Sequence, residues 1–259
     1  MTPKFSLKDI HKSFGHKRVL QGVNLEIMPG ESVVIIGGSG SGKSVLLKCL
    51  LGLVSPDSGS ILMDGQEIVR ESLVQNEARL QDIGVVFQGS ALFDSLKVWE
   101  NVAFRLIHAH HMDRKQAKQI ALEKLAEVGL NETVSELPPS EISGGMQRRV
   151  ALARAIATHP HVLFFDEPTA GLDPIFSSVI NDLIRIHVKN LGATALTITH
   201  DMNSARHVAD RIAMLYEGKI IWSGRASDID TCDNPYVQQF IQGLAEGPIE
   251  LDTAIRRVA

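Results

Sequence analysis

Residues 37–44 have the residue types and spacing of a phosphate-binding loop. They match the pattern G-x-x-x-x-G-K-[ST] with Gly37, Gly38, Ser39, Gly40, Ser41, Gly42, Lys43 and Ser44. Glycines let the backbone turn its amide groups toward a phosphate, and a following helix adds the positive end of its dipole. Lys43 can reach the β- and γ-phosphates of a nucleoside triphosphate, and Ser44 can coordinate Mg²⁺. The alternative is a glycine-rich turn that binds no ligand.

Two adjacent acids form a second candidate site. Asp166 and Glu167 follow the apolar run Val162–Phe165, which is typical of a strand in a protein core. Such a strand delivers both carboxylates to one edge of a sheet, where Asp166 can hold the shell of a Mg²⁺ ion through water. Glu167 can orient or deprotonate an attacking water molecule. Taken alone, the same pair is also compatible with an acidic helix cap beside a strand.

The elements that position these residues alternate between strand and helix patterns. The β-branched run Val33–Ile36 predicts a strand buried on both faces, and the segment after the glycines predicts a helix over residues 43–51. Further strands and a hairpin are expected at residues 23–27, 61–63, 84–87, 162–165, 195–199 and 212–222. Helices are expected within residues 89–157, one of them capped by Ser143, and over 176–190. Strand–helix alternation around a helical insert predicts an α/β core with a helical lobe.

The composition excludes several classes of protein. The 259 residues correspond to about 1.7 domains of ordinary size, which favours one large domain or a domain with an inserted lobe. The formal net charge of −4 argues against a dedicated nucleic-acid binder. Neither a signal peptide nor an apolar run of about 18 residues is found, so any membrane-spanning part is expected on another chain. Cys49 and Cys232 are expected to be ordinary thiols.

Four more short segments accompany the phosphate loop and the acidic pair. Gln88 follows Val86 and Phe87, and the run Ile142–Met146 contains Ser143, Gly144 and Gly145. The run Ala170–Asp173 follows the acids, and His200 ends the last of the predicted central strands. In this order the chain resembles the ATP-binding cassette (ABC) ATPases, where the four segments are the Q-loop, the signature motif, the D-loop and the switch histidine. Phe14 stands where that family usually stacks an aromatic ring on adenine.

The resemblance implies a fold and its division into parts. The implied fold is α/β, a P-loop NTPase of the ABC ATPase type, with a RecA-like core, an antiparallel β subdomain and an inserted helical subdomain. The nucleotide-binding core with its β subdomain would comprise residues 1–88 and 158–228. The helical subdomain with the signature motif would comprise residues 89–157, and a C-terminal helix and tail residues 229–259.

The resemblance also implies the site residues, with ATP and Mg²⁺ as cofactors. The metal would be held by Ser44, Gln88 and Asp166, and the catalytic groups would be Lys43, Gln88, Glu167 and His200. Nucleotide contacts are expected from Phe14, Gly37, Gly38, Ser39, Gly40, Ser41, Gly42, Lys43, Ser44, Gln88, Ser143, Gly144, Gly145, Asp173 and His200. Two copies would pair head to tail, so that each ATP lies between Lys43 of one chain and Ser143 of the other. Asp173 would cross the same interface.

Some positions depart from the family pattern. Met146 replaces the usual Gln of the signature, and Ile142 replaces the usual Leu. Because Ser143 and the backbone amides remain, the phosphate contact is expected to be retained. Phe14 lacks the hydroxyl of the commoner Tyr, and Ala170–Gly171 replaces the commoner Ser-Ala of the D-loop.

Less common segments narrow the resemblance. Residues 89–94, 141–149 and 237–249 resemble the ATPases of Mla-type phospholipid transporters, which maintain outer-membrane lipid asymmetry. This implies an integral membrane permease, an MCE-domain substrate-binding protein and a small STAS-type accessory subunit as partners, no nucleic acid, and a place on the cytoplasmic face of the bacterial inner membrane. One alternative is the ATPase of an importer for small polar solutes such as amino acids. Another is a soluble non-transport ABC protein, although those usually carry two cassettes.

Three surface features remain. Asn234 and Pro235 predict the start of a helix, and an apolar face is expected on it from Tyr236, Val237, Phe240, Ile241 and Leu244. By the resemblance, residues 247–259 would reach the partner ATPase. The apolar segment 89–112 is suited either to contact with the permease or to core packing. His108, His110 and His111 are expected in an exposed loop without a metal.

Overall fold

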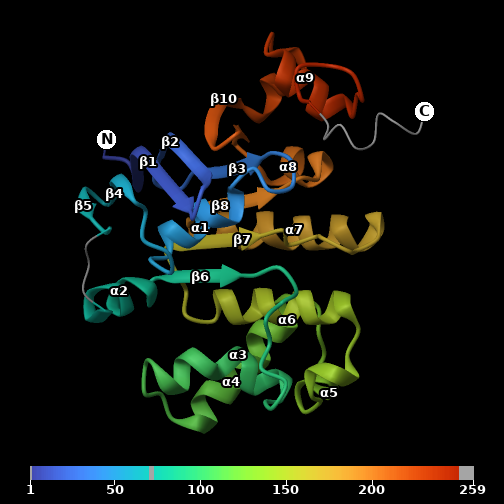
Figure 1. Ribbon diagram of the computed structural model, residues 1–259. Coiled ribbons are helices and arrows are strands. Elements are labelled where there is room, and N and C mark those ends of the chain that lie inside the picture. The colour runs from blue at the N-terminus through green and yellow to red at the C-terminus, as the bar shows by residue number, and fades with distance from the viewer. Residues whose placement is uncertain (1, 70–72, 251–259) are drawn as a thin grey trace.

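The computed structural model describes residues 2–69 and 73–250, which form two sheets with helices packed around them (Figure 1). The antiparallel sheet has the strand order β2-β1-β4-β5, and the larger sheet has the order β10-β9-β3-β8-β7-β6. Strands β3, β6, β7, β8 and β9 run parallel, and β10 pairs antiparallel with β9. The strands are β1 (Phe5–Phe14), β2 (Lys17–Ile27), β3 (Ser32–Ile36), β4 (Ser58–Met63), β5 (Gln66–Glu67), β6 (Ile83–Val86), β7 (Val162–Asp166), β8 (Thr194–Thr199), β9 (Arg211–Tyr216) and β10 (Lys219–Arg225). This two-sheet α/β arrangement agrees with the fold that the resemblance implies.

Helices cover the larger sheet and form a lobe below β6 in Figure 1. The lobe contains α3, α4 and α5, and α6 connects it to the sheet. The α-helices are α1 (Lys43–Leu50), α2 (Leu73–Leu80), α3 (Val98–His108), α4 (Arg114–Glu127), α5 (Glu132–Ser135), α6 (Gly144–Ile156), α7 (Pro174–Leu191), α8 (Met202–Val208) and α9 (Pro235–Gln242). Two 3₁₀ helices span Pro139–Glu141 and Ala226–Thr231. In the described part of the chain, no helix combines the length and apolar character needed to cross a bilayer.

The larger sheet is buried on both faces, as the β-branched run of β3 predicts. Val33 and Ile35 belong to an apolar cluster between the two sheets, whereas Val34 and Ile36 belong to a second cluster on the helical side. Phe164 and Phe165 of β7 divide in the same way. Side chains on adjacent positions of a strand point to opposite faces, so each strand anchors two cores. A sheet held this firmly fixes the position of the loops at its ends.

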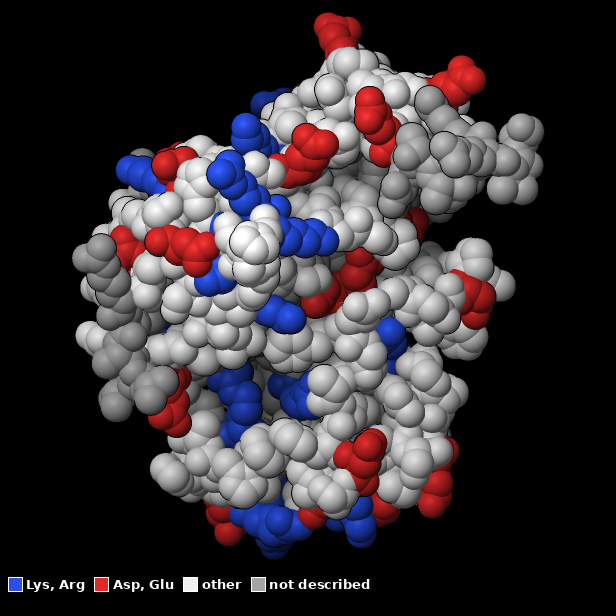
Figure 2. All heavy atoms as spheres, in the orientation of Figure 1, with Lys and Arg blue, Asp and Glu red and all other residues white. Residues whose placement is uncertain are grey.

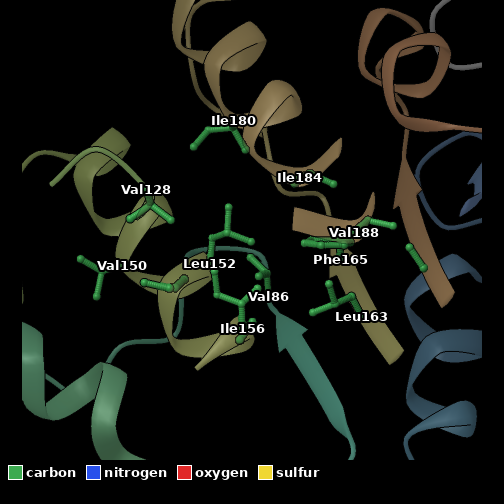
Figure 3. Packing of buried hydrophobic residues seen from close by; sticks show 14 of the residues in the cluster. Val86, Val128, Val150, Leu152, Ile156, Leu163, Phe165, Ile180, Ile184 and Val188 are labelled. Atoms are coloured by element: carbon green, nitrogen blue, oxygen red, sulfur yellow. The ribbon is translucent and has the colours of Figure 1, made fainter. Parts of the chain in front are cut away.

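The helical-side core joins the lobe to the sheet. Figure 3 shows Val128, at the end of α4, beside Val150, Leu152 and Ile156 of α6, with Leu163 and Phe165 of β7 and the α7 residues beyond them. Helix α6 also approaches β6 closely, because a Cβ atom added at Gly84 would lie 2.3 Å from the backbone oxygen of Ala155. Glycine is therefore required at this strand position for steric reasons.

Most local expectations are confirmed, and two are wrong. Ser143 caps α6 by accepting from the Met146 amide, and Asn234 caps α9. Helix α9, however, ends at Gln242 because Gly243 adopts φ 67°, so Leu244 lies outside the helix and is 52% exposed. His108 is the last residue of α3 rather than part of a loop, and its ring packs against Phe104 at a centroid distance of 4.6 Å, tilted by 43°.

Three remaining expectations concern the cysteines and two segments. Cys49 and Cys232 are free thiols. The apolar segment 89–112 divides between the two interpretations, because Val98, Trp99 and Val102 are buried whereas Phe93 is 44% exposed. Most of the tail expected to reach a partner, residues 251–259, lies outside the described residues.

Candidate functional site

The predicted site residues converge because the parallel strands all end at one edge of the larger sheet. Strand β8 lies between β3 and β7, with Ile36 paired to Thr199 and Asp166 paired to Ile198. Val86 of β6 pairs with Phe165 of β7. The phosphate loop, the acidic pair, His200 and Gln88 each follow one of these strands at the same level. Residues separated by up to 163 positions in the sequence therefore meet at one edge, which is where open α/β sheets place their ligands.

The phosphate loop connects β3 to α1. Two of its glycines occupy positions that a larger residue does not fit. A Cβ atom at Gly37 would lie 2.3 Å from the backbone oxygen of Leu215. Gly42 has φ +109° at the N-cap of α1, a conformation that favours glycine. The buried Oγ atom of Ser41 has no hydrogen-bond partner among the described residues. An unpartnered donor inside a loop of this shape is suited to a phosphate oxygen.

Lys43 lies at the start of α1 with its ammonium group turned into the loop. Its Nζ donates to the backbone oxygens of Gly37 at 2.7 Å and Gly38 at 3.1 Å, and the residue is 7% exposed. Burial lowers the pKa of Lys43, while the nearby carboxylates of Glu167 and Asp166 act in the opposite direction. A buried ammonium beside two acids can neutralise charge on a bound polyphosphate.

Asp166 and Ser44 place two oxygen ligands side by side. The Oγ atom of Ser44 lies 3.5 Å from Oδ1 of Asp166, which is 8% exposed. Burial and the neighbouring carboxylate of Glu167 raise the pKa of Asp166, while Ser44, Lys48 and Lys43 act to lower it. A hydroxyl and a carboxylate are the oxygen ligands that Mg²⁺ uses at nucleotide sites. The side chains present therefore fit that ion.

Glu167 is held by three contacts beyond the end of β7. His200 Nδ1 lies 3.0 Å from both carboxylate oxygens of Glu167, and the Thr199 hydroxyl donates to Oε2 of Glu167 at 3.3 Å. The Glu167 amide donates to the Ile198 oxygen at 2.9 Å. Its φ is +48°, an uncommon conformation for a residue with a side chain, and such strain gathers at functional positions. The arrangement places one carboxylate where it can accept a proton from water near the phosphate loop.

Phe14 lies beside the phosphate loop although the two belong to different elements. A cavity of about 350 Å³ is lined by Phe14, Lys17 and Val19 together with residues 40–45. Phe14 is 52% exposed and Nζ of Lys12 lies over its ring, 5.5 Å from the centroid, so the exposed part of the ring is available to a planar ligand. Gln88 is also exposed, two residues beyond β6.

The signature residues and Asp173 lie together on another part of the chain. Ser143 precedes α6, and Gly145 faces the ring of Phe176, which would lie 3.4 Å from an added Cβ. Asp173 caps α7 by accepting from the amides of Ile175 and Phe176 at 2.9 and 3.1 Å. The cavity beside the phosphate loop is lined from residues 14–45. Ser143 thus presents a second helix N-terminus separate from the first phosphate site.

Sequence reasoning missed several polar residues that hold these loops. Thr199 contacts Glu167, and Arg148 of α6 donates to the Ala170 oxygen at 3.0 Å and to the Ser90 hydroxyl at 3.3 Å. The hydroxyl of Ser204 in α8 bonds to Thr169 and Asn181 in two other segments and to Asp201, the N-cap of its own helix. Only Ser204 carried a local signal, because it lies three residues after Asp201, a spacing typical of a helix cap.

Comparisons with known proteins agree with this geometry. A profile of the ABC transporter family matches residues 20–170. The chain is 44% identical to the protein Trigalactosyldiacylglycerol 3, chloroplastic, of Arabidopsis thaliana, over 93% of this chain and 74% of that protein. It is 37% identical to the intermembrane phospholipid transport system ATP-binding protein MlaF of Haemophilus influenzae, over 94% of this chain and 92% of that protein.

Two further similarities concern another cargo and the nucleotide. The chain is 37% identical to the histidine/lysine/arginine/ornithine transport ATP-binding protein HisP of Escherichia coli, over 93% of this chain and 97% of that protein. Among solved structures, a dimeric ATP-binding cassette in a post-hydrolysis state with ADP and Pi bound matches with a TM-score of 0.79 and 34% identity. That match covers 86% of this chain and 98% of the other.

Proposed function

Since the chain belongs to the ABC transporter family and has its ATPase cassette, we propose that it hydrolyses ATP to drive phospholipid transport through a separate membrane permease. The observation that carries the ATPase assignment is the meeting of Lys43, Asp166, Glu167 and His200 at one sheet edge. Lys43 is placed by the start of α1, the two acids by the end of β7, and His200 by the end of β8.

The first step is binding of ATP at the phosphate loop. The amides of residues 37–42, the Ser41 hydroxyl and Lys43 hold the phosphates, and Phe14 stacks on the adenine. Lys43 exchanges its two loop carbonyls for phosphate oxygens, which are stronger acceptors because they are charged. Ser44, Asp166 and Gln88 would hold Mg²⁺, which would supply positive charge to neutralise the phosphates.

The second step is attack by water on the γ-phosphate. Glu167 orients this water and accepts its proton, because its buried carboxylate lies just beyond β7 and is held there by Thr199 and His200. His200 is 60% exposed at its side chain while it contacts Glu167, so it can face the γ-phosphate as well as the base. In this assignment His200 links the presence of the γ-phosphate to the position of Glu167.

A second copy of the chain completes each site. Ser143, Gly144 and Gly145 present a helix N-terminus that lies outside the cavity lined by residues 14–45. Head-to-tail pairing places this N-terminus on the ATP bound by the partner, and Asp173 at the same interface. The similar cassette described as dimeric with ADP and Pi supports this arrangement. The helical lobe, residues 89–157, would then carry the contact that closes on the partner's nucleotide.

A groove between the core and the lobe is the proposed contact for the permease. It has a volume of about 400 Å³ and is mostly apolar, with lining residues from α2, β6 and α3. Phe93, Phe104 and Leu53 form apolar walls, and Arg105 and Arg154 line the same groove. Figure 2 shows basic side chains recessed in a hollow of the displayed face at the level of the lobe. A short amphipathic helix of a membrane subunit fits a groove of this kind.

Phospholipid is the proposed cargo because two of the three relatives have names that refer to lipids. One of these two, Trigalactosyldiacylglycerol 3, has the highest identity of the three to this chain, 44%. We extend the proposal to an MCE-domain protein and a small STAS-type subunit in the complex, at the cytoplasmic face of the bacterial inner membrane. An importer of amino acids is the second candidate, because the chain is 37% identical to HisP, the same identity that it has to MlaF.

Purification of the intact complex from detergent-solubilised membranes separates the two cargoes. Mass spectrometry of the complex should detect phospholipid retained after extensive washing, and ATP hydrolysis should respond to added phospholipid. Stimulation by one amino acid, with no response to phospholipid, would replace the lipid proposal with the importer. Ribosomes in the purified material instead of a membrane subunit would contradict both.

A further inference from the structure

A buried polar network lies beside the proposed catalytic residues and is not used by the mechanism above. Its centre is Ser204 of α8, which is 1% exposed. The Ser204 hydroxyl lies 3.0 Å from the hydroxyl of Thr169, 2.9 Å from Nδ2 of Asn181 and 2.6 Å from Oδ2 of Asp201. Thr169 and Asn181 are 5% and 4% exposed. One hydroxyl therefore joins the segment after Glu167, the middle of α7 and the loop that contains His200.

The direction of each hydrogen bond follows from the donors present. A serine hydroxyl has one proton to donate and two lone pairs to accept with. Asp201 is a carboxylate and can only accept, so the proton of Ser204 goes to Asp201. Both lone pairs of Ser204 then accept, one from the Asn181 amide and one from the Thr169 hydroxyl. Ser204 is fully used, so removal of its hydroxyl leaves buried donors on two other segments without an acceptor.

The network reaches the catalytic residues through Asp201 and Thr199. The amide of Asp201 donates to the Thr199 hydroxyl at 3.0 Å, and that hydroxyl donates to Glu167 at 3.3 Å. His200 lies between these two residues in the sequence. A cavity of about 340 Å³ is lined by Glu167, His200 and Asp201 as well as by Thr169 and Asn181. The network and the catalytic pair thus border the same space.

We propose that Ser204 is a positioning residue that holds the His200 loop in register with the D-loop, so that movement at Asp173 changes the position of His200. The path runs from Thr169, the residue before the D-loop, through the Ser204 hydroxyl to the Asp201 carboxylate. It rests on the proposed roles of Glu167 and His200. Ser204 acts through these residues and does not itself reach the nucleotide.

The test compares steady-state ATP hydrolysis by the full-length chain in four single variants. Ser204→Ala removes the central hydroxyl, and Thr169→Val removes the partner hydroxyl while it keeps the side-chain shape. Thr169→Ser restores the hydroxyl. Ser227→Ala is the matched control. Ser227 is exposed, its hydroxyl donates to Asp228 at 2.7 Å, and it does not belong to the Ser204 network. Thermal unfolding of every variant checks that it is folded.

We expect the turnover number to fall roughly three- to ten-fold in Ser204→Ala and in Thr169→Val, the factor that one buried hydrogen bond represents. The KM for ATP should remain within about two-fold, because neither residue contacts nucleotide. Thr169→Ser and Ser227→Ala should retain the wild-type rate. The double variant Thr169→Val with Ser204→Ala should be no slower than Ser204→Ala, since both changes remove the same bond.

An unchanged turnover number in folded Ser204→Ala would overturn the proposal, as would a change in KM alone or additive losses in the double variant. If Ser204→Ala does not fold, the comparison of Thr169→Val with Thr169→Ser decides. Glu167→Gln is measured beside these variants. Near-normal hydrolysis in Glu167→Gln would overturn the roles assigned to the catalytic pair, whereas loss there with a normal rate in Ser204→Ala overturns only the positioning role.

Discussion

Replacement of Glu167 by Gln changes the chemistry of the proposed base and little of its surroundings. Gln has the size of Glu, and its amide oxygen can still accept the hydrogen bond from Thr199. What is lost is the ability to take a proton from water. A general base contributes about 10²- to 10⁴-fold to a rate, which corresponds to about 2.7 to 5.4 kcal/mol of barrier. We therefore expect turnover to fall by that factor, with ATP still bound.

The assay separates binding from hydrolysis. Phosphate release under saturating ATP gives the turnover number, and equilibrium titration with a fluorescent ATP analogue gives the affinity. Affinity within about three-fold of wild type, together with the fall in turnover, would agree with a role in the chemical step alone. A turnover number close to that of wild type would remove Glu167 from the mechanism. Equal losses of affinity and turnover would instead indicate that the substitution disturbs the phosphate loop through Lys43.

Lys43→Ala should weaken ATP binding by roughly 10- to 100-fold, the worth of a charge-assisted hydrogen bond to phosphate, and wild-type affinity in a titration would contradict its assignment. Burial and Glu167 raise the pKa of Asp166 in the folded protein above its unfolded value of 3.8. The Asp166 side chain therefore contributes fully to stability below pH 3.8, and this contribution is lost as the pH rises through the folded pKa. Asp166→Asn without nucleotide should therefore raise the melting temperature at about pH 8, and the gain should shrink toward about pH 4; a gain independent of pH would count against this reasoning. Phe165→Ala should lower the free energy of unfolding by about 3 to 5 kcal/mol in chemical denaturation, because Phe165 is fully buried. The control Val179→Ala, at a 41% exposed position, should change it by about 0.5 kcal/mol or less.

The sequence predicts the parts of the site that depend on strand ends and helix starts. Val33–Ile36 indicates a strand buried on both faces, and the loop after it can only continue at the sheet edge. The apolar run before Asp166 carries the same information for the acids. These predictions succeed because burial of a strand is a local property of its side chains.

The remaining contacts depend on loops that meet only in the folded chain. Nothing near Arg148 in the sequence indicates that its guanidinium lies between Ser90 and Ala170. The contact between Thr169 and Ser204, which are 35 positions apart, is likewise not indicated by the residue pattern. The prediction that Leu244 belongs to the apolar face of α9 is wrong for a related reason, because the left-handed conformation of Gly243 ends the helix at Gln242.

Because Gly84 and Ala155 are in close contact, helix α6 can rotate about this point and move its far end, where Ser143 lies. The helix touches β6 near its last turn and carries Ser143 at the other end, so at about 1.5 Å per residue the lever arm is about 18 Å. A rotation of roughly 10° about this pivot carries Ser143 through about 3 Å. That displacement equals the length of one hydrogen bond. A small tilt of the lobe is therefore enough to make or break the proposed contact between Ser143, at the start of α6, and a phosphate bound by a second copy of the chain.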